Sequence, residues 1–146
     1  MPFPYYIIRP SSFTFQRYPR WADVYWFDFG AVRSSQDRTM AEPHLAVVVS
    51  NPAITLKGTV LIVPLSGAEH RKQGYAFHVL VTRRECPKLD KDSIVKVDQI
   101  YCVTVKPGLP DQYYLTTFST EIMRRIYEQV LRVLNVDQIV KALSSS

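Results

Sequence analysis

Two apolar runs in the middle of the chain constrain its fold more than any other feature of the sequence. Residues 44–49 read HLAVVV and residues 59–65 read TVLIVPL, and the short segment between them contains Pro52 and Gly58. Near-continuous apolar runs that are rich in β-branched residues and bounded by turn formers are typical of strands buried on both faces, or bent across a small barrel. The two runs therefore predict the core of a β-sheet.

Three further segments carry strand patterns. Residues 22–30, ADVYWFDFG, alternate between two sets of side chains and end at a glycine. Alternation returns in residues 75–81, YAFHVLV. Residues 93–105, SIVKVDQIYCVTV, predict one strand that carries Lys96 and Asp98 on the same face. Together with the two apolar runs, these segments predict a sheet of short strands.

The C-terminal part of the chain carries a helical pattern. Ser119 is a suitable N-cap, and Glu121 favours the beginning of a helix. Apolar residues then recur at helical spacing and form one apolar face: Ile122, Ile126, Val130 and Leu134. We expect a short strand, then a helix over about residues 119–134, and a short terminal helix in VDQIVKAL, residues 136–143.

The order of these elements indicates the fold class, which is mainly β with α. Strands followed by a terminal helix, without βαβ alternation, favour an antiparallel sheet curled into a small SH3-like barrel with a C-terminal helix. A chain of 146 residues fits one domain, which we assign to residues 21–146. Residues 1–20 contain four prolines and six aromatic residues without a steady period, and we expect them to form an extended N-terminal arm.

Composition and charge narrow the classes of function. The chain is 47% hydrophobic and 21% charged, as is typical of a globular protein, and it has no apolar window long enough for a membrane span. We expect a soluble cytoplasmic protein without membrane association, whose two cysteines, Cys86 and Cys102, stay reduced. The net charge of +5 favours anionic partners such as nucleic acid or an acidic protein.

The motifs of the common cofactor and metal chemistries do not occur in the sequence. It lacks the P-loop, the nucleophile elbow of hydrolases, the HExxH zinc motif and a CxxC pair. Its five glycines also do not form the glycine-rich turn of a dinucleotide-binding fold. Kinase and metalloprotease chemistry are therefore excluded at the level of motifs, and we expect neither a cofactor nor a metal.

Four polar residues stand at the ends of the apolar strands or within them: His44, Ser66, Lys96 and Asp98. RNA cleavage without a metal needs a base for the 2′-hydroxyl, an acid for the leaving 5′-oxygen and donors that stabilise the phosphorane. These side chains can supply such groups, because the strand ends of a small barrel converge on one rim. Each also has an ordinary explanation, since His44 can mark strand entry, Ser66 a turn, and Lys96 with Asp98 a solvated ion pair. For His78 a structural role is favoured.

Three stretches carry a resemblance to a known family. They are ADVYWFDFG, then PHLAVVVSNP followed by TVLIVPLSG, and then DSIVKVDQIYCV. Their order and spacing resemble the MazF/PemK family of toxin endoribonucleases from toxin–antitoxin systems, over about residues 20–134. The resemblance implies an SH3-like barrel of the kind shared with the gyrase poison CcdB. It also implies a homodimer and metal-independent cleavage of single-stranded RNA at short sequence motifs.

The resemblance also implies which residues form the site. In this family, the arginine that begins the second stretch and the Thr or Ser that ends the next strand are central to catalysis. By register, these positions are His44 and Ser66 here. Lys96 and Asp98 match a basic and an acidic residue that some members use at the site, and Gln99 matches the glutamine that follows.

The chain departs from the family pattern in several places. Residues 1–20 are an addition, and Ala22, Leu45 and Tyr101 replace a glycine, a proline and an arginine. The largest change is His44, because a guanidinium is permanently charged and clamps phosphate, whereas an imidazole is charged only in part near neutral pH. Two functions stay open. The first is a toxin endoribonuclease that leaves 2′,3′-cyclic phosphate and 5′-hydroxyl ends. The second is a non-catalytic binding module that acts on RNA or on a protein partner such as gyrase.

The basic residues of two polar loops are candidate RNA contacts under either function. Arg33 and Arg38 lie in the loop before the first apolar run, and Arg71 and Lys72 lie in the loop after the second. We expect these four side chains to bind RNA phosphates, together with Gln99. The same basic rim suits an acidic antitoxin protein, which would block the RNA groove.

Overall fold

The computed structural model describes residues 18–31, 43–70 and 77–145. These ranges contain the strands β1 (Asp23–Asp28), β2 (Pro43–Val48), β3 (Thr59–Gly67), β4 (His78–Val81), β5 (Ser93–Lys96), β6 (Tyr101–Thr104) and β7 (Tyr114–Thr117). They also contain the helices α1 (Pro52–Thr55), α2 (Val105–Gly108), α3 (Thr120–Val133) and α4 (Val136–Ser144). The expected N-terminal arm, residues 1–20, lies almost wholly outside the described residues.

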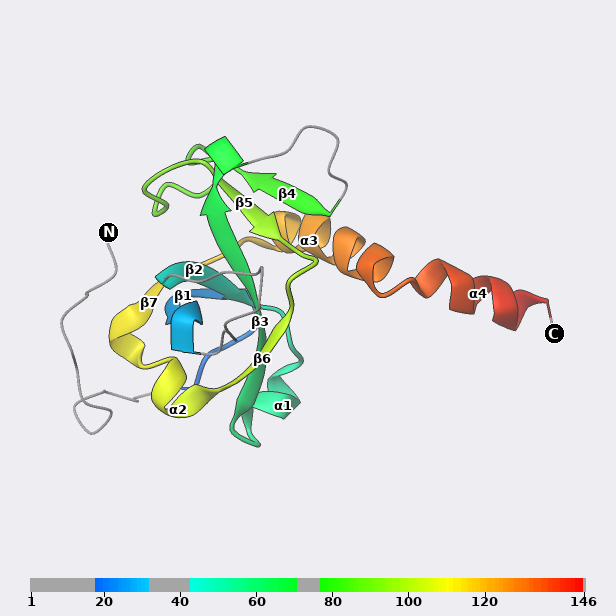
Figure 1. The fold of residues 1–146 in the computed structure, drawn as a ribbon, viewed down its shortest axis with the longest axis horizontal. Coiled ribbons are helices and arrows are strands. Elements are labelled where there is room, and N and C mark those ends of the chain that lie inside the picture. Colours follow the sequence, from blue (N-terminus) through cyan, green and yellow to red (C-terminus); the bar gives the residue numbers. More distant parts are fainter. Residues whose placement is uncertain (1–17, 32–42, 71–76, 146) are drawn as a thin grey trace.

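The strands form one antiparallel sheet that curls into a half-barrel (Figure 1). The strand order is β4-β5-β3-β2-β1-β7, and β6 pairs with β3. The long strand β3 is the centre of this arrangement, since β2 pairs along one of its edges while β6 and β5 pair in succession along the other. The curled antiparallel sheet followed by helices confirms the predicted fold class.

The prediction of a single strand over residues 93–105 is wrong. That segment forms two strands, β5 and β6, joined by the turn at residues 97–100. On β3 only two residues separate Ile62, which faces Tyr101, from Leu65, which faces Val95. On the partner segment, five residues lie between Val95 and Tyr101. The extra residues have no partner position on β3 and form a turn that leaves the ladder. Asp98 therefore lies in a turn and not in a strand.

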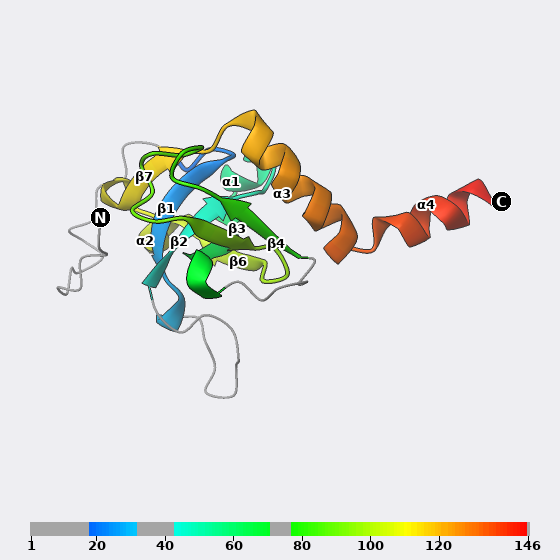
Figure 2. The same cartoon turned by 90° about the horizontal axis from the view of Figure 1, so that it is seen from above.

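Alternate residues of the strands pack into two buried clusters, one on each face of the sheet. Val24 and Val47 belong to the first cluster, whereas Tyr25 and Ala46, their neighbours in sequence, belong to the second. Helix α3 covers the first cluster (Figure 2) with the buried side chains Ile122, Met123, Ile126 and Val130. This confirms the predicted alternation in β1 and most of the predicted apolar face of α3.

The beginning of α3 follows the sequence, but its end does not. The Ser119 hydroxyl accepts a hydrogen bond from the backbone N–H of Ile122 at 3.3 Å, which confirms the predicted N-cap. Leu134, predicted on the apolar face, is 62% exposed because the helix ends at Val133. Asn135 then adopts a left-handed conformation (φ 59°), which asparagine tolerates better than most residues.

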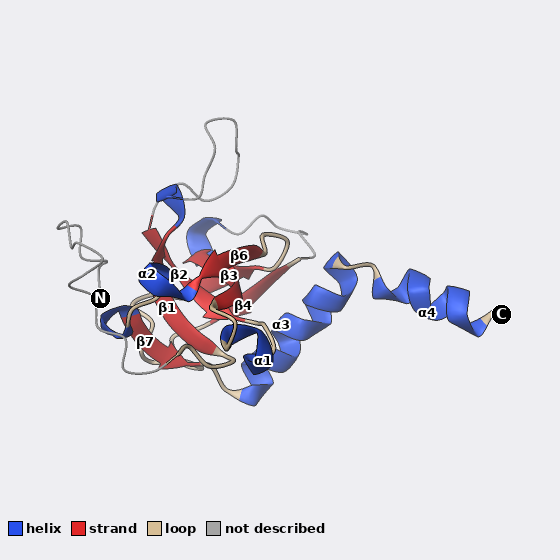
Figure 3. Ribbon diagram, turned by 90° about the horizontal axis from the view of Figure 1, so that it is seen from below, coloured by secondary structure: helices blue, strands red, loops and turns tan. Residues whose placement is uncertain are grey.

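Helix α4 extends away from the sheet (Figure 3), and none of its residues is buried. Its existence confirms the predicted short terminal helix. Across the described ranges, no helix is both long enough and apolar enough to cross a membrane.

Candidate active site

The pairing of β3, β5 and β4 gathers polar side chains on one face of the sheet. Ser66 pairs with Ile94, and Lys96 pairs with His78. Directly paired residues of an antiparallel sheet point to the same side, as do residues two positions apart on a strand. Ser66, Lys96 and His78 therefore share a face with the apolar residues Ile94 and Leu80. We call it the polar face after its three polar side chains. Diagonal neighbours such as Ser66 and Lys96 are about 7–8 Å apart in this geometry.

The opposite face of the same three strands, which we call the core face, is buried. Leu65, Val95 and Val79 alternate with the polar residues and belong to the cluster that α3 covers. Helix α3 also contacts β4 directly, since the Arg125 guanidinium donates a hydrogen bond to the Leu80 carbonyl oxygen at 3.1 Å. The strands that carry the polar face are thus held in place by the packing of their opposite face against α3.

The turn after β5 brings Asp98 to the polar face. The backbone N–H of Gln99 donates to the Lys96 carbonyl oxygen at 3.0 Å, which closes the turn. The Asp98 Oδ1 atom lies 4.0 Å from Nε2 of His78. The His78 side chain is only 9% exposed, whereas the Asp98 side chain is 30% exposed. The turn therefore presents a carboxylate to solvent beside a nearly buried imidazole.

His44 lies at the beginning of β2, on the other side of β3. It pairs with Phe27 of β1, and two residues later Ala46 pairs with Pro64 of β3. The β2–β3 ladder ends at the pair Ala46 and Pro64, and continuing its register by two residues brings His44 opposite Ser66, on the polar face. Because β3 and β5 stand between β2 and β4, three strand spacings, or about 14 Å in a flat sheet, separate His44 from His78.

Burial differs among the candidate residues. Ser66 is buried at 7% exposure, while His44, Lys96 and Gln99 are half-buried. The side-chain Oε1 atom of Gln99 is buried and has no hydrogen-bond partner among the residues that the structure describes. A buried amide oxygen without a donor is costly, so a ligand donor at this position would be favourable.

The structure thus brings three of the four proposed catalytic residues together: Ser66, Lys96 and Asp98. In the continued register, His44 shares their face and lies opposite Ser66 on the neighbouring strand β2. The proposed RNA-binding residues Arg33, Arg38, Arg71 and Lys72 lie outside the described residues.

Sequence reasoning did not place His78 beside Lys96 and Asp98, because that position depends on the pairing of β4 with β5. The only sequence signal for it was the alternation in YAFHVLV, which gives the face of a residue relative to its own strand and not its neighbours on the next one.

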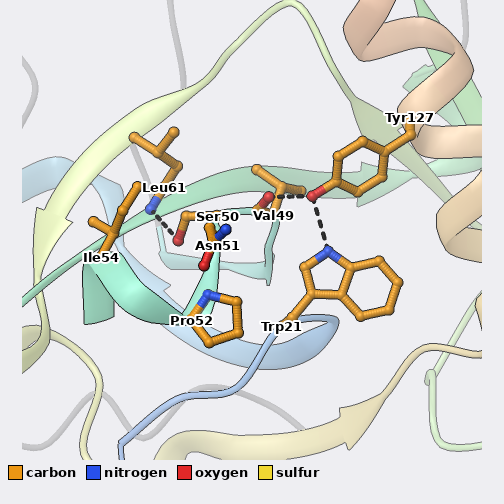
Figure 4. A pocket seen from close by; sticks show the side chains of 8 residues that line it. All are labelled: Trp21, Val49, Ser50, Asn51, Pro52, Ile54, Leu61 and Tyr127. Carbon is orange, nitrogen blue, oxygen red and sulfur yellow. Dashed lines mark hydrogen bonds between the residues drawn. The ribbon is translucent and has the colours of Figure 1, made fainter. Parts of the chain in front are cut away.

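A second recess, on the side of α1 and α3, has a different character (Figure 4). Its volume is about 760 Å³, and its lining includes Trp21, Val49, Leu61 and Tyr127. The Trp21 indole N–H donates to the Tyr127 hydroxyl at 2.8 Å, and that hydroxyl donates to the Val49 carbonyl oxygen. The Ser50 hydroxyl accepts from the backbone N–H of Leu61 at 3.1 Å. These hydroxyl and indole groups are committed to the protein itself, so the recess is not the candidate catalytic site.

The described residues hold no group of three or more His, Cys, Asp or Glu side chains that could bind a metal ion. Cys86 is buried and Cys102 is exposed, and both are free.

Several solved structures share the fold of this chain. An endoribonuclease in complex with its cognate antitoxin, from a mycobacterial species, is 21% identical, with a TM-score of 0.61 over 80% of this chain and 95% of that one. A second mycobacterial endoribonuclease is 20% identical, with a TM-score of 0.60 over 83% and 95% of the two chains. MazF in a MazE–MazF structure from Deinococcus radiodurans is 15% identical, with a TM-score of 0.58 over 82% and 97%. At these identities the likeness establishes the fold.

Family membership follows from the sequence match. The family model of the PemK-like, MazF-like toxin of type II toxin–antitoxin systems matches residues 20–134. The chain therefore belongs to this toxin family. No curated protein sequence matches it.

The backbone at Ala22 supports the register of the resemblance. Ala22 stands where the family pattern has a glycine, and its φ is 73°. Such a conformation costs a residue with a Cβ roughly 1–2 kcal/mol relative to its ordinary conformations, whereas glycine adopts it freely. The chain thus keeps the local geometry of a glycine position although the glycine is absent.

Proposed function

We propose that this chain is the toxin of a type II toxin–antitoxin system and acts as a sequence-specific, metal-independent endoribonuclease on single-stranded RNA. The observation that carries the proposal is the polar face itself. Ser66, Lys96 and Asp98 converge there from β3, β5 and the following turn, in a chain of the PemK-like, MazF-like family.

The proposed reaction is an internal transesterification. The 2′-oxygen of a ribose attacks the adjacent phosphorus, its proton passes to a base, and the bond from phosphorus to the 5′-oxygen breaks as that oxygen gains a proton from an acid. The products are a 2′,3′-cyclic phosphate and a 5′-hydroxyl. RNA supplies its own nucleophile, so no cofactor enters the reaction.

The order of the residues across the sheet suits an in-line attack, which needs the base and the acid on opposite sides of phosphorus. A phosphate over Ser66 and Lys96 would have Asp98 on one side and His44 on the other. We assign Asp98 as the base and the His44 imidazolium as the acid. The Lys96 ammonium and the Ser66 hydroxyl stabilise the negative charge of the phosphorane.

RNA binding would extend beyond the reacting phosphate. Arg33, Arg38, Arg71 and Lys72 are proposed to contact backbone phosphates, and Gln99 is proposed to accept a hydrogen bond from the RNA through its buried Oε1 atom. Each phosphate that a cation neutralises releases counterions, so affinity should fall steeply with salt. A flat salt profile would remove these side chains from the proposal.

The proposed setting is the cytoplasm, with an acidic antitoxin and a second copy of this chain as partners. The net charge of +5 favours an acidic partner. One of the similar structures is described as an endoribonuclease in complex with its cognate antitoxin, and another as MazE–MazF. An acidic protein encoded directly upstream should inhibit RNA cleavage at equimolar ratio, and light scattering should give twice the mass of the chain.

Digestion of a long RNA in EDTA, with the new ends mapped, tests the proposal. The purified protein should cut at one short motif and leave cyclic phosphate and 5′-hydroxyl ends. Asp98→Asn and His44→Ala should each lower the rate of cutting by about 10²–10⁴-fold, whereas Asp137→Asn, an exposed aspartate on α4, should not change it. Intact RNA across a range of sequences would overturn the nuclease assignment.

The rival function, a non-catalytic module that binds RNA or a protein such as gyrase, rests on one observation. His44 lacks the permanent charge of the family's arginine, so the site has lost its fixed phosphate clamp. Growth inhibition by the chain should then survive His44→Ala and Ser66→Ala together. Loss of inhibition in that double variant would favour the enzyme.

A further inference from the structure

His78 lies beside two of the proposed catalytic residues, Lys96 and Asp98. Its backbone pairs with Lys96, and its Nε2 atom lies 4.0 Å from Oδ1 of Asp98. It thus neighbours two of the proposed catalytic residues at once. Its side chain is 9% exposed, so the imidazole packs beneath the more exposed carboxylate.

Strand β4 holds this imidazole firmly. Val79 and Val81, on either side of Leu80, are buried at 6% and 0% exposure. From α3, Arg125 donates a hydrogen bond to the Leu80 carbonyl oxygen, and the Arg132 guanidinium lies over the Phe77 ring at 5.6 Å from its centroid. The flanks of His78 are therefore fixed by packing, and a side chain on such a strand is a precise support.

His78 can give the Asp98 carboxylate a support of this kind. Asp98 lies in the turn after β5 and is not a strand residue, so the ladder of the sheet does not fix its backbone. A carboxylate that accepts a proton from a 2′-hydroxyl must hold one oxygen toward that hydroxyl. An imidazole N–H that binds the other oxygen would set that orientation, in the way that a third group orients the base in a catalytic triad.

We propose that His78 is a positioning residue that orients the Asp98 carboxylate through its Nε2–H group. This inference rests on the proposed endoribonuclease function and assigns a further residue to it. The separation of 4.0 Å shortens to a hydrogen bond when RNA is bound, since catalytic hydrogen bonds are often long in the free enzyme.

His78 does not serve as the acid or base itself. Its side chain is nearly buried, and the strands β3 and β5 lie between its own strand and that of His44, so we assign it neither proton-transfer role. Its effect on the reaction therefore passes through Asp98.

A double-mutant cycle between His78 and Asp98 tests this dependence. His78→Leu should lower kcat by about 10–100-fold with KM nearly unchanged, as is common for residues that orient a catalytic group. His78→Gln, which keeps an N–H donor, should restore most of the rate. In an Asp98→Ala background, His78→Leu should cost less than about 3-fold more, because the group it orients is gone. Equal losses in both backgrounds, or no rescue by glutamine, would overturn the proposal.

A second measurement does not depend on activity. NMR titration of His78 should show its midpoint at lower pH in Asp98→Ala than in the parent chain, because removal of a nearby anion disfavours the imidazolium. Among the described residues, Lys96 on β5 pairs with His78, and the Arg132 guanidinium on α3 lies over the ring of the neighbouring Phe77. Both cations are the same in the two proteins. An unchanged midpoint would overturn the contact. A parent chain that cuts no RNA but shows the shifted midpoint would refute the function and keep the contact.

Discussion

The two faces of β3, β5 and β4 are built from alternate residues of the same strands, yet they carry different side chains. The core face carries Leu65 and Val95, both at most 2% exposed beneath α3. The polar face carries Ser66 and Lys96, their neighbours in sequence. A strand with one packed face holds the side chains of its other face in place. Substitutions at neighbouring positions of β3 or β5 should therefore have different effects: on the core face they should lower stability, and on the polar face they should lower the rate of RNA cleavage.

The largest effect is expected on the polar face. Lys96→Gln removes the ammonium proposed to stabilise the phosphorane, and it should lower kcat for RNA cleavage by about 10²–10³-fold. The free energy of unfolding should change by no more than about 1 kcal/mol, because Lys96 is only half-buried. Lys141→Gln, on exposed α4, is the matched control and should keep full activity. A comparable loss in the control would remove the special role of Lys96.

The next effect is expected on the core face. Leu65→Ala deletes a side chain that is 2% exposed, and it should lower the free energy of unfolding by about 2–5 kcal/mol. RNA cleavage should stay near the parent rate at temperatures where the variant is folded. Urea denaturation and a cleavage assay on the same preparation would check both points. A folded variant without activity would show that the two faces are not separable.

A smaller effect is expected where α3 begins. Ser119→Ala removes the hydroxyl that accepts from the backbone N–H of Ile122, and the cost should be about 1 kcal/mol of stability. Ser119→Asp keeps an acceptor at the N-cap and should recover the loss. Thermal unfolding of the two variants measures the difference, and equal destabilisation by both would contradict the capping role.

The smallest effect concerns Glu85, in the segment between β4 and β5. The backbone N–H of Thr82, and then the Arg125 guanidinium on α3, lower the pKa of Glu85 from its usual 4.5. A carboxyl whose pKa is lower in the folded state contributes stability above its unfolded pKa and loses it as pH falls through the folded value. The gap in stability between the parent chain and Glu85→Gln should therefore close between about pH 5 and pH 3. A constant gap across that range would contradict the assignment.

The fold could be predicted largely because its signals are local. The apolar runs that became β2 and β3 and the cap at Ser119 need no knowledge of distant residues. The prediction of one strand over residues 93–105 was wrong because β5 and β6 pair in succession with the same edge of β3. The turn between them depends on that pairing, which the sequence of the segment alone does not show. The prediction that Leu134 lies on the apolar face of α3 was wrong, because the helix ends one residue before it, at Val133.

The candidate site was predictable only in part. The resemblance pointed to His44, Ser66, Lys96 and Asp98, whereas the spacing of Lys96 and Asp98 alone favoured a solvated ion pair. The place of His78 beside them was not predicted, because its neighbours come from the pairing of β4 with β5, which a single sequence does not reveal.

The central claim is that the polar face carries the chemistry while the core face carries the stability. The initial rate of RNA cleavage by Ser66→Ala and by Leu65→Ala, measured side by side where both variants are folded, tests it most directly. We expect Ser66→Ala to lower the initial rate by at least about 10-fold and Leu65→Ala to cleave at a rate close to that of the parent chain. A parent-like rate for Ser66→Ala, with the loss falling on Leu65→Ala, would contradict it.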